Sequence, residues 1–226
     1  MSFRFADRTE AGELLAAELR RYAKRADVLV LALPRGGVPV GAVIARELGV
    51  PLDVFVVRKL GLPGYPELAM GAIASGGVRA LNADVLNNLH VPATVFEEVA
   101  ARESAELARR EAAYRDGRPG PDPEAKTVIL VDDGIATGST MMAAIGALRQ
   151  GNAERIVVGA PVIAASTYPE IARAADELAA VLVSDDFGGV GGFYEDFSQT
   201  SDAEVRRLLR HTRDADAAEA EPAEPS

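Results

Sequence analysis

The chain has 226 residues, of which 48% are hydrophobic and 26% charged, a composition typical of one globular domain. It contains no cysteine, which excludes thiol catalysis, Cys-ligated zinc and iron-sulfur clusters. The first residues turn polar before an apolar run develops, and no apolar stretch approaches the ~20 residues that span a bilayer. We therefore expect a cytoplasmic protein without a signal peptide or a membrane helix.

The net charge of −10 is unevenly distributed along the chain. Residues 214–226 carry five acids and no base, so half of the acidic excess lies in this low-complexity segment. Because the segment has no large apolar side chain to bury, we expect a disordered acidic tail after one domain spanning residues 1–213. The acidic body also argues against a broad nucleic-acid surface, which needs clustered Lys and Arg.

The first half of the chain predicts helices alternating with strands. Asp7 and Glu10 form a capping box that opens an amphipathic helix. Short apolar runs then predict buried strands, and Gly and Pro residues predict a mobile loop followed by a hairpin. The expected order is strand 28–33, helix 39–48, strand 53–57, loop 58–69 and a hairpin of 70–74 with 78–81.

The second half continues this alternation. Thr94 with Glu97, Thr167 with Glu170, and Ser201 with Glu204 are spaced as capping boxes that open three helices. The first of these helices ends in residues 116–123, and the other predicted elements are strand 127–131, helix 140–150, strand 156–163 and strand 178–183. Because parallel strands need helical crossovers, we expect an α/β fold with a mostly parallel, twisted sheet flanked by helices.

Residues 128–140, with the sequence VILVDDGIATGST, combine the features of a phosphosugar site. Four apolar residues form the end of a buried strand, Asp132 and Asp133 follow at the sheet edge, and a turn of small and hydroxyl residues opens a helix. Backbone N–H groups of such a turn suit a phosphate, and a sugar diol with a divalent metal would satisfy the two acids. The alternative is an acidic strand end followed by an ordinary capped helix. Other nucleotide motifs fail, because there is no Gly-Lys-Ser/Thr and Tyr194 stands where a dinucleotide fingerprint needs glycine.

These thirteen residues resemble the signature of type I phosphoribosyltransferases, which bind 5-phosphoribosyl 1-pyrophosphate. The run from about residue 28 to 210 is similar to a bacterial subgroup whose acceptor is generally unassigned. The resemblance implies that Asp132 and Asp133 hold the ribose 2- and 3-hydroxyls, directly and through substrate-bound Mg²⁺. It also implies a fold with a small hood and a flexible loop, and a 5-phosphate site made by Ala136, Thr137, Gly138, Ser139 and Thr140.

Two further segments carry the resemblance. The turn of Pro34, Arg35, Gly36 and Gly37 is similar to the family's pyrophosphate loop, which implies a cis Pro34–Arg35 peptide. Residues 58–64 resemble the opening of the flexible catalytic loop. Arg35, Arg58 and Lys59 are accordingly the candidate catalytic cations, because negative charge develops on the departing pyrophosphate; the alternative is that each is a solvated loop charge.

The acceptor site is less well defined. Phe187, Phe193 and Tyr194 are candidate hood aromatics that stack on a flat ring, although a loop that tucks them into the core is an equal alternative. Enzymes for 6-oxopurines resemble the signature but carry Asp at the position of Ala136, so hypoxanthine and guanine are disfavoured. Glu67 is a candidate acid or base, or an exposed surface residue. His90 and His211 are expected at the surface or at helix ends.

We therefore expect a phosphoribosyltransferase that uses Mg²⁺ and transfers 5-phosphoribose to a nitrogenous base or related small acceptor, with a homodimer as a further expectation. The first alternative is a regulatory protein that binds phosphoribosyl pyrophosphate or a nucleotide without significant turnover. A second is a phosphoribosyl-pyrophosphate-dependent hydrolase or a partner of one. Retention of Arg58, Lys59 and a full loop favours the enzyme over the sensor.

Overall fold

The centre of the fold is a five-stranded parallel sheet with the strand order β2-β1-β6-β7-β8. The computed structural model describes residues 3–115 and 119–220, without the side chains of residues 66–67 and 213–220. The continuous apolar runs form the buried strands, as predicted. Their bounds are β1 Val28–Ala32, β2 Leu52–Val54, β6 Thr127–Val131, β7 Arg155–Ala164 and β8 Glu177–Ser184.

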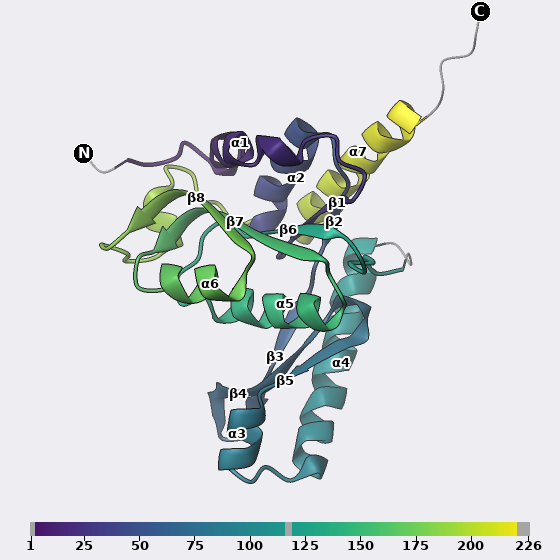
Figure 1. The fold of residues 1–226 in the computed structure, drawn as a ribbon, viewed down its shortest axis with the longest axis vertical. Coiled ribbons are helices and arrows are strands. Elements are labelled where there is room, and N and C mark those ends of the chain that lie inside the picture. The colour runs from purple at the N-terminus through teal and green to yellow at the C-terminus, as the bar shows by residue number, and fades with distance from the viewer. Residues whose placement is uncertain (1–2, 116–118, 221–226) are drawn as a thin grey trace, which may run out of the picture.

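Helices cover both faces of this sheet (Figure 1). One core cluster joins the strands to α1 Arg8–Glu18, α2 Gly37–Leu48, α4 Ala93–Arg115 and α7 Asp202–Ala220. A second cluster on the opposite face joins them to α5 Ser139–Gln150 and α6 Tyr168–Ala174. The predicted α/β class with a helix-flanked parallel sheet is confirmed, and the carboxyl ends of β1 and β6 lie side by side.

A second, three-stranded antiparallel sheet projects from the main body (Figure 1). It consists of β3 Val57–Leu62, β4 Tyr65–Ala74 and β5 Val78–Leu81, with the short helix α3 Ala83–Asn88 at its end. The prediction of a loop over residues 58–69 is wrong, because these residues form most of the β3-β4 hairpin. The hairpin of 70–74 with 78–81 is confirmed, and the 3₁₀ turn Ser75–Gly77 joins its strands.

Several expected element ends also differ from the structure. The predicted strand 53–57 is divided, because β2 ends at Val54 and Val57 already belongs to β3. Thr94 does not cap its helix, which begins one residue earlier at Ala93. Helix α3 has no counterpart among the predicted elements. The caps at Asp7 and Ser201 are confirmed, since both side chains accept backbone N–H groups of the following turn.

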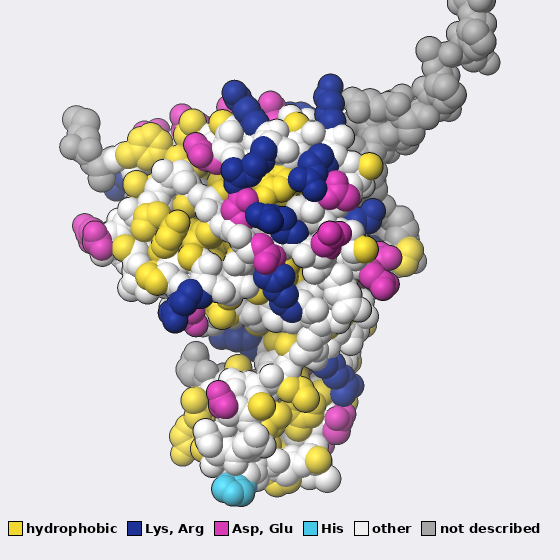
Figure 2. Space-filling model, in the orientation of Figure 1, with side chains coloured by type: hydrophobic (Ala, Val, Ile, Leu, Met, Phe, Trp, Pro, Cys, Tyr) yellow, Lys and Arg dark blue, Asp and Glu magenta, His cyan; other side chains and the backbone are white. Residues whose placement is uncertain are grey.

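The last helix continues to Ala220, so the expected domain boundary at residue 213 falls within α7. The rest of the expected acidic tail, residues 221–226, lies outside the described part of the chain. Within the described residues, no helix is both long and apolar enough to cross a membrane. On the face shown in Figure 2, Lys and Arg side chains are interspersed with Asp and Glu, so their charges partly cancel.

Candidate functional site

Two adjacent carboxylates lie at the carboxyl end of β6, where the sequence placed them. The Asp133 backbone N–H donates to Asp132 Oδ1 at 2.9 Å, which holds the Asp132 carboxylate against the backbone at the end of β6. Burial and the neighbouring charge of Asp133 raise the pKa of Asp132 well above its usual range. Burial also raises the pKa of Asp133, a rise that the Arg8 guanidinium limits. Such a pair is costly in isolation and is suited to hydroxyl donors or a cation.

Arg8 is a site residue that the sequence did not reveal. Its Nε and Nη2 atoms donate to Asp133 Oδ2 at 2.9 and 2.8 Å, and only 11% of its side chain is exposed. The guanidinium also lies 4.1 Å from the Phe197 ring centroid and donates to the Ser198 carbonyl. Helix α1 and the segment after β8 are thereby joined at the acid pair. Because 125 positions separate Arg8 from Asp133, no local pattern signals the contact.

The turn of residues 136–140, named the phosphate turn after its expected ligand, opens helix α5, as predicted, and lines a small pocket with Asp132. Gly138 has φ +71°, and a Cβ built on it would lie 2.7 Å from Thr167 Cγ2, so only glycine fits. Within the described residues no side chain caps α5. The first N–H groups of this helix, which have no intrahelical partner, therefore remain available to an anion.

Thr167 supports this turn from the neighbouring strand connection. The sequence suggested that it caps a short helix, but its side chain makes no such hydrogen bond. Instead its Oγ1 donates to the Ala136 carbonyl at 2.6 Å. A hydroxyl that follows β7 thus fixes the start of the turn that follows β6. This role was missed because the same residue pattern is typical of a helix N-terminus.

The turn from Pro34 to Gly37 packs directly on the acid pair. The Pro34–Arg35 peptide bond is cis, as the family resemblance implied. A Cβ on Gly36 would lie 2.0 Å from Asp133 Oδ2, and a Cβ on Gly37 would lie 2.6 Å from the Val131 carbonyl oxygen. Both glycines are therefore required for the close approach of the turn to the end of β6. Arg35 is 39% exposed, and its Nη1 lies 3.7 Å from Asp202 Oδ1 of α7.

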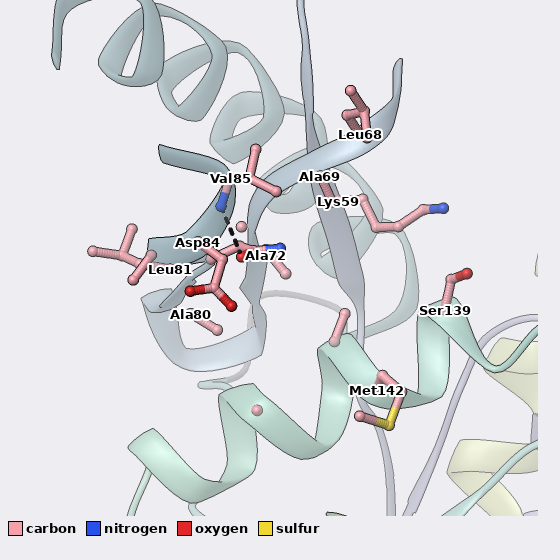
Figure 3. Close-up of a pocket in the computed structure, with 15 residues that line it drawn as sticks. Lys59, Leu68, Ala69, Ala72, Ala80, Leu81, Asp84, Val85, Ser139 and Met142 are labelled. Carbon is pink, nitrogen blue, oxygen red and sulfur yellow. Dashed lines mark hydrogen bonds between the residues drawn. The ribbon is translucent and has the colours of Figure 1, made fainter. Parts of the chain in front are cut away.

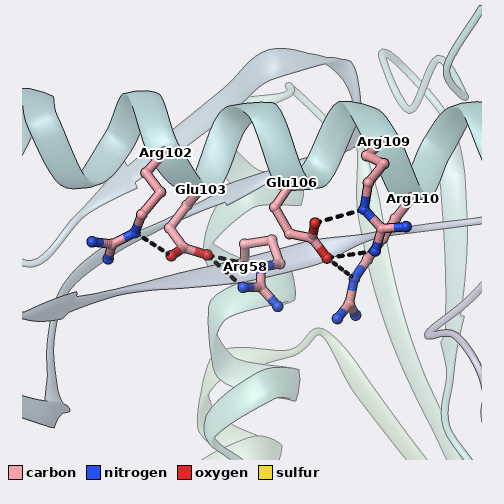
Figure 4. Close-up of polar contacts among 6 residues, drawn as sticks. All are labelled: Arg58, Arg102, Glu103, Glu106, Arg109 and Arg110. Atoms are coloured by element: carbon pink, nitrogen blue, oxygen red, sulfur yellow. Dashed lines mark hydrogen bonds and ion pairs between the residues drawn. The ribbon is translucent and has the colours of Figure 1, made fainter.

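The other two candidate cations diverge, because successive side chains of a strand point to opposite faces. Arg58 turns toward α4 and donates from Nε and Nη2 to Glu103 Oε2 at 3.0 and 2.5 Å (Figure 4). Lys59 lines the groove beside α5 together with Ser139 and Met142 (Figure 3). The structure thus brings Lys59, but not Arg58, to the groove beside Ser139, whereas both residues line a second pocket with Thr140.

The groove of Figure 3 has a volume of about 660 Å³ and lies between the hairpin sheet and α5. Its walls are mostly apolar, with Leu68, Ala72, Val85 and Met142 among the lining residues. It adjoins the phosphate turn through Ser139, the first residue of α5. The side chain of the candidate acid or base Glu67 is outside the described part of the structure.

The three candidate hood aromatics differ in burial. Phe193 and Tyr194 are 9% and 3% exposed and pack with the fully buried Phe5. Phe187 lies against Phe193, with ring centroids 5.1 Å apart. The Tyr194 hydroxyl donates to the Asp133 carbonyl at 2.6 Å, so it holds the backbone that carries the acid pair. Phe193 and Tyr194 thus belong to the core, as the alternative expected, whereas Phe187 is only partly buried, and stacking of a flat ring on these side chains stays a prediction.

Comparison with known proteins agrees with this geometry. Residues 7–198 match the family model described as the phosphoribosyl transferase domain. Two relatives are 43% identical to this chain over 205 residues, which is 91% of its length. Both are provisionally named phosphoribosyl transferases and come from Mycobacterium tuberculosis, strains CDC 1551 / Oshkosh and ATCC 25618 / H37Rv. The chain spans about half the length of these curated relatives, since the alignment covers 46% of each.

A solved structure covers nearly the same extent as this chain. The crystal structure of the protein TT1426 from Thermus thermophilus is 40% identical, with a TM-score of 0.84 over 92% of this chain and 99% of that one. The acid pair, the turn of residues 136–140 and the cis peptide therefore occur in a chain whose sequence matches one family and whose fold matches that of TT1426. This chain belongs to the phosphoribosyl transferase domain family.

Proposed function

We propose that this protein transfers 5-phosphoribose from phosphoribosyl pyrophosphate to a nitrogenous acceptor, with release of pyrophosphate. The observation that carries the proposal is the meeting of three parts at the ends of β1 and β6: the acid pair, the uncapped turn of α5 and the glycine turn against Asp133. Together they offer hydrogen-bond acceptors for a diol and, beside them, N–H donors for two anionic groups. Phosphoribosyl pyrophosphate carries such a diol between its 5-phosphate and its pyrophosphate.

In the proposed reaction the protein mainly binds and positions the donor. Asp132 accepts hydrogen bonds from the ribose hydroxyls, together with the Asp133 oxygen that Arg8 leaves free, and the amides of residues 136–140 hold the 5-phosphate. Lys59 adds positive charge as the bond to pyrophosphate breaks, and the hairpin sheet excludes water from the groove. These roles are proposals for the named residues. Phe193 and Tyr194, two of the three expected hood aromatics, are buried and support the site rather than offering a face to the acceptor.

Magnesium fits the donor set only in part. Among the described residues no three His, Asp or Glu side chains are grouped to hold a metal ion by themselves. Asp132 and Asp133 supply hard oxygen donors, which suit Mg²⁺ held through water and substrate oxygens. When bound in that way, the ion would supply charge neutralisation at the pyrophosphate.

The deciding experiment measures isotopic pyrophosphate release with Mg²⁺ across a panel of purine, pyrimidine and pyridine bases, beside a binding isotherm for the donor. Lys59→Ala should lower turnover about 10²-fold, on the order of 3 kcal/mol, with a much smaller change in affinity, because the charge acts on the transition state. Arg58→Ala is the matched control, and it should lower turnover less because Glu103 already pairs with Arg58. Equal losses in the two variants would contradict the role of Lys59.

The second candidate is a regulatory protein that binds phosphoribosyl pyrophosphate without significant turnover. The Arg58–Glu103 ion pair favours it, since this pair already engages one of the expected catalytic cations. Wild-type protein that binds the donor with Mg²⁺ but releases no pyrophosphate with any acceptor would establish this function instead.

A further inference from the structure

A separate cavity of about 360 Å³ lies between helices α2 and α7, away from the phosphate turn. Its floor consists of small apolar side chains that are nearly inaccessible to bulk solvent. Ala42 is 8% exposed, Val43 6% and Val50 3%. Small-molecule sites typically have volumes of ~300 to 1,000 Å³, so this cavity accommodates a compact molecule of one or two rings.

The rim of this cavity is mainly basic. Arg46 comes from α2 and Arg207 and His211 from α7, whereas Glu204 is the only acid among the lining residues. Positions 207 and 211 are four residues apart and therefore share one face of α7. Arg46 pairs with Glu47 at 3.0 Å. For Arg207 no ion-pair partner is found within the described part of the chain, so its charge is available to a ligand.

We propose that this cavity is an effector site for a small organic acid with an apolar ring. The ring would lie on the floor formed by Ala42, Val43 and Val50, and the acidic group would be bound by Arg207 at the rim. A guanidinium beside an apolar surface favours such a ligand over a neutral one, because it offers a charge-assisted hydrogen bond where burial of the ring is already favourable. A purely inorganic anion would leave the apolar floor uncovered.

The cavity is connected to the Pro34–Gly37 turn through both of its walls. Helix α2 begins at Gly37, the last residue of that turn, and Asp202, the first residue of α7, pairs with Arg35. In a closely packed protein, a ligand that changes the spacing of α2 and α7 must also shift residues at their ends. The assignment of this turn to pyrophosphate rests on the proposed function, but the existence of the cavity does not.

The probe for this site is 8-anilinonaphthalene-1-sulfonate, which joins apolar rings to one anion and fluoresces when it leaves water. Titration of the full chain should show one saturable site. Arg207→Glu should weaken binding at least tenfold. Arg173→Glu makes the same charge change on the exposed surface of α6, across the main sheet, and should leave affinity within twofold of wild type. Binding to Arg207→Glu within twofold of wild type would overturn the proposal.

A second measurement uses wild-type protein and so does not depend on the folding of a variant. Saturation with the probe should shift the amide resonances of Val43, Val50, Gly36 and Gly37, and leave those of Gly188 and Gly192 in place. Shifts of Val43 and Val50 without Gly36 and Gly37 would refute the connection to the turn, and shifts of neither pair would refute the site. Absence of pyrophosphate release would remove the proposed function and leave both results unaffected.

Discussion

Removal of the Arg8 charge tests whether the acid pair depends on a counter-ion from helix α1. The Arg8 and Asp133 side chains are 11% and 12% exposed, so the pair is largely buried. Loss of one partner from a buried pair costs ~3 to 5 kcal/mol, because the remaining charge is unpaired. Since neither side chain is completely buried, we expect Arg8→Met to lower the free energy of unfolding by about 3 kcal/mol at pH 8.

The effect of Arg8→Met should depend on pH in a defined direction. Burial already raises the pKa of Asp133, and without Arg8 only a backbone hydrogen bond would limit that rise. When an acidic group has a higher pKa in the folded than in the unfolded state, the free energy of unfolding decreases as pH rises. The difference between Arg8→Met and wild type should therefore be largest at pH 8 and shrink toward acidic pH, as Asp133 takes up its proton in both proteins.

Urea unfolding at pH 8 and pH 4 measures these differences. Arg4→Met is the matched control, because Arg4 is exposed and its replacement should change stability by less than ~0.5 kcal/mol. In the double variant Arg8→Met/Asp133→Asn no charge is left unpaired, so about 2 kcal/mol should be recovered. An Arg8→Met loss no larger than that of Arg4→Met, or a loss independent of pH, would refute the reasoning.

Three further substitutions test the acid pair and the phosphate turn. Because burial raises the pKa of Asp132, wild-type stability should fall as pH rises above the ordinary Asp range. In urea unfolding, Asp132→Asn should lose less stability than wild type between pH 4 and pH 8. Parallel curves of stability against pH would contradict this. Gly138→Val should abolish the binding of ribose 5-phosphate measured by calorimetry and lower the free energy of unfolding by about 1 to 3 kcal/mol. The reason is that φ +71° and the contact with Thr167 exclude a branched side chain. Normal binding would show that the turn only starts a helix. Thr167→Val should lower the free energy of unfolding by about 1 to 3 kcal/mol and weaken ribose 5-phosphate binding, because it leaves the Ala136 carbonyl unpaired. Thr167→Ser keeps the hydroxyl and should retain both stability and binding. Equal losses in the two variants would exclude the hydroxyl as the cause.

The parts of the site that could be predicted from the sequence are contiguous in the chain. Strand β6 has the predicted bounds, 127–131, because five buried residues form an unbroken run at the centre of the sheet. The acids and the turn follow within ten residues, and Gly138 marks the point where the backbone enters a left-handed conformation. In this segment the residues that determine the local structure are neighbours in the sequence, so the sequence pattern predicts the strand, the acids and the turn together.

The parts that could not be predicted depend on contacts between distant segments. Arg8 reaches Asp133 across the fold, and Tyr194 supports the acid pair because it packs with Phe5 and Val162 in the core. The hairpin over residues 58–69 has the sequence pattern of a loop because glycine and proline interrupt it. The structure accommodates these residues with register shifts on both sides of Gly61 and a turn at Gly64, φ +85°.

The geometry of β3 limits which cation can act at the phosphate turn. A strand has a side-chain period of two, so the Arg58 and Lys59 side chains point to opposite faces of β3 while residues 57–60 remain paired with β4, although both residues line a pocket beside Thr140. To bring Arg58 to the site, β3 would have to slip by one residue, which would turn the buried Leu60 outward, or Arg58 would have to leave Glu103. Both changes oppose burial and pairing that the structure already contains. In the proposed function the cationic role on this strand is therefore assigned to Lys59, and the Arg58–Glu103 pair is a contact between the hairpin sheet and α4.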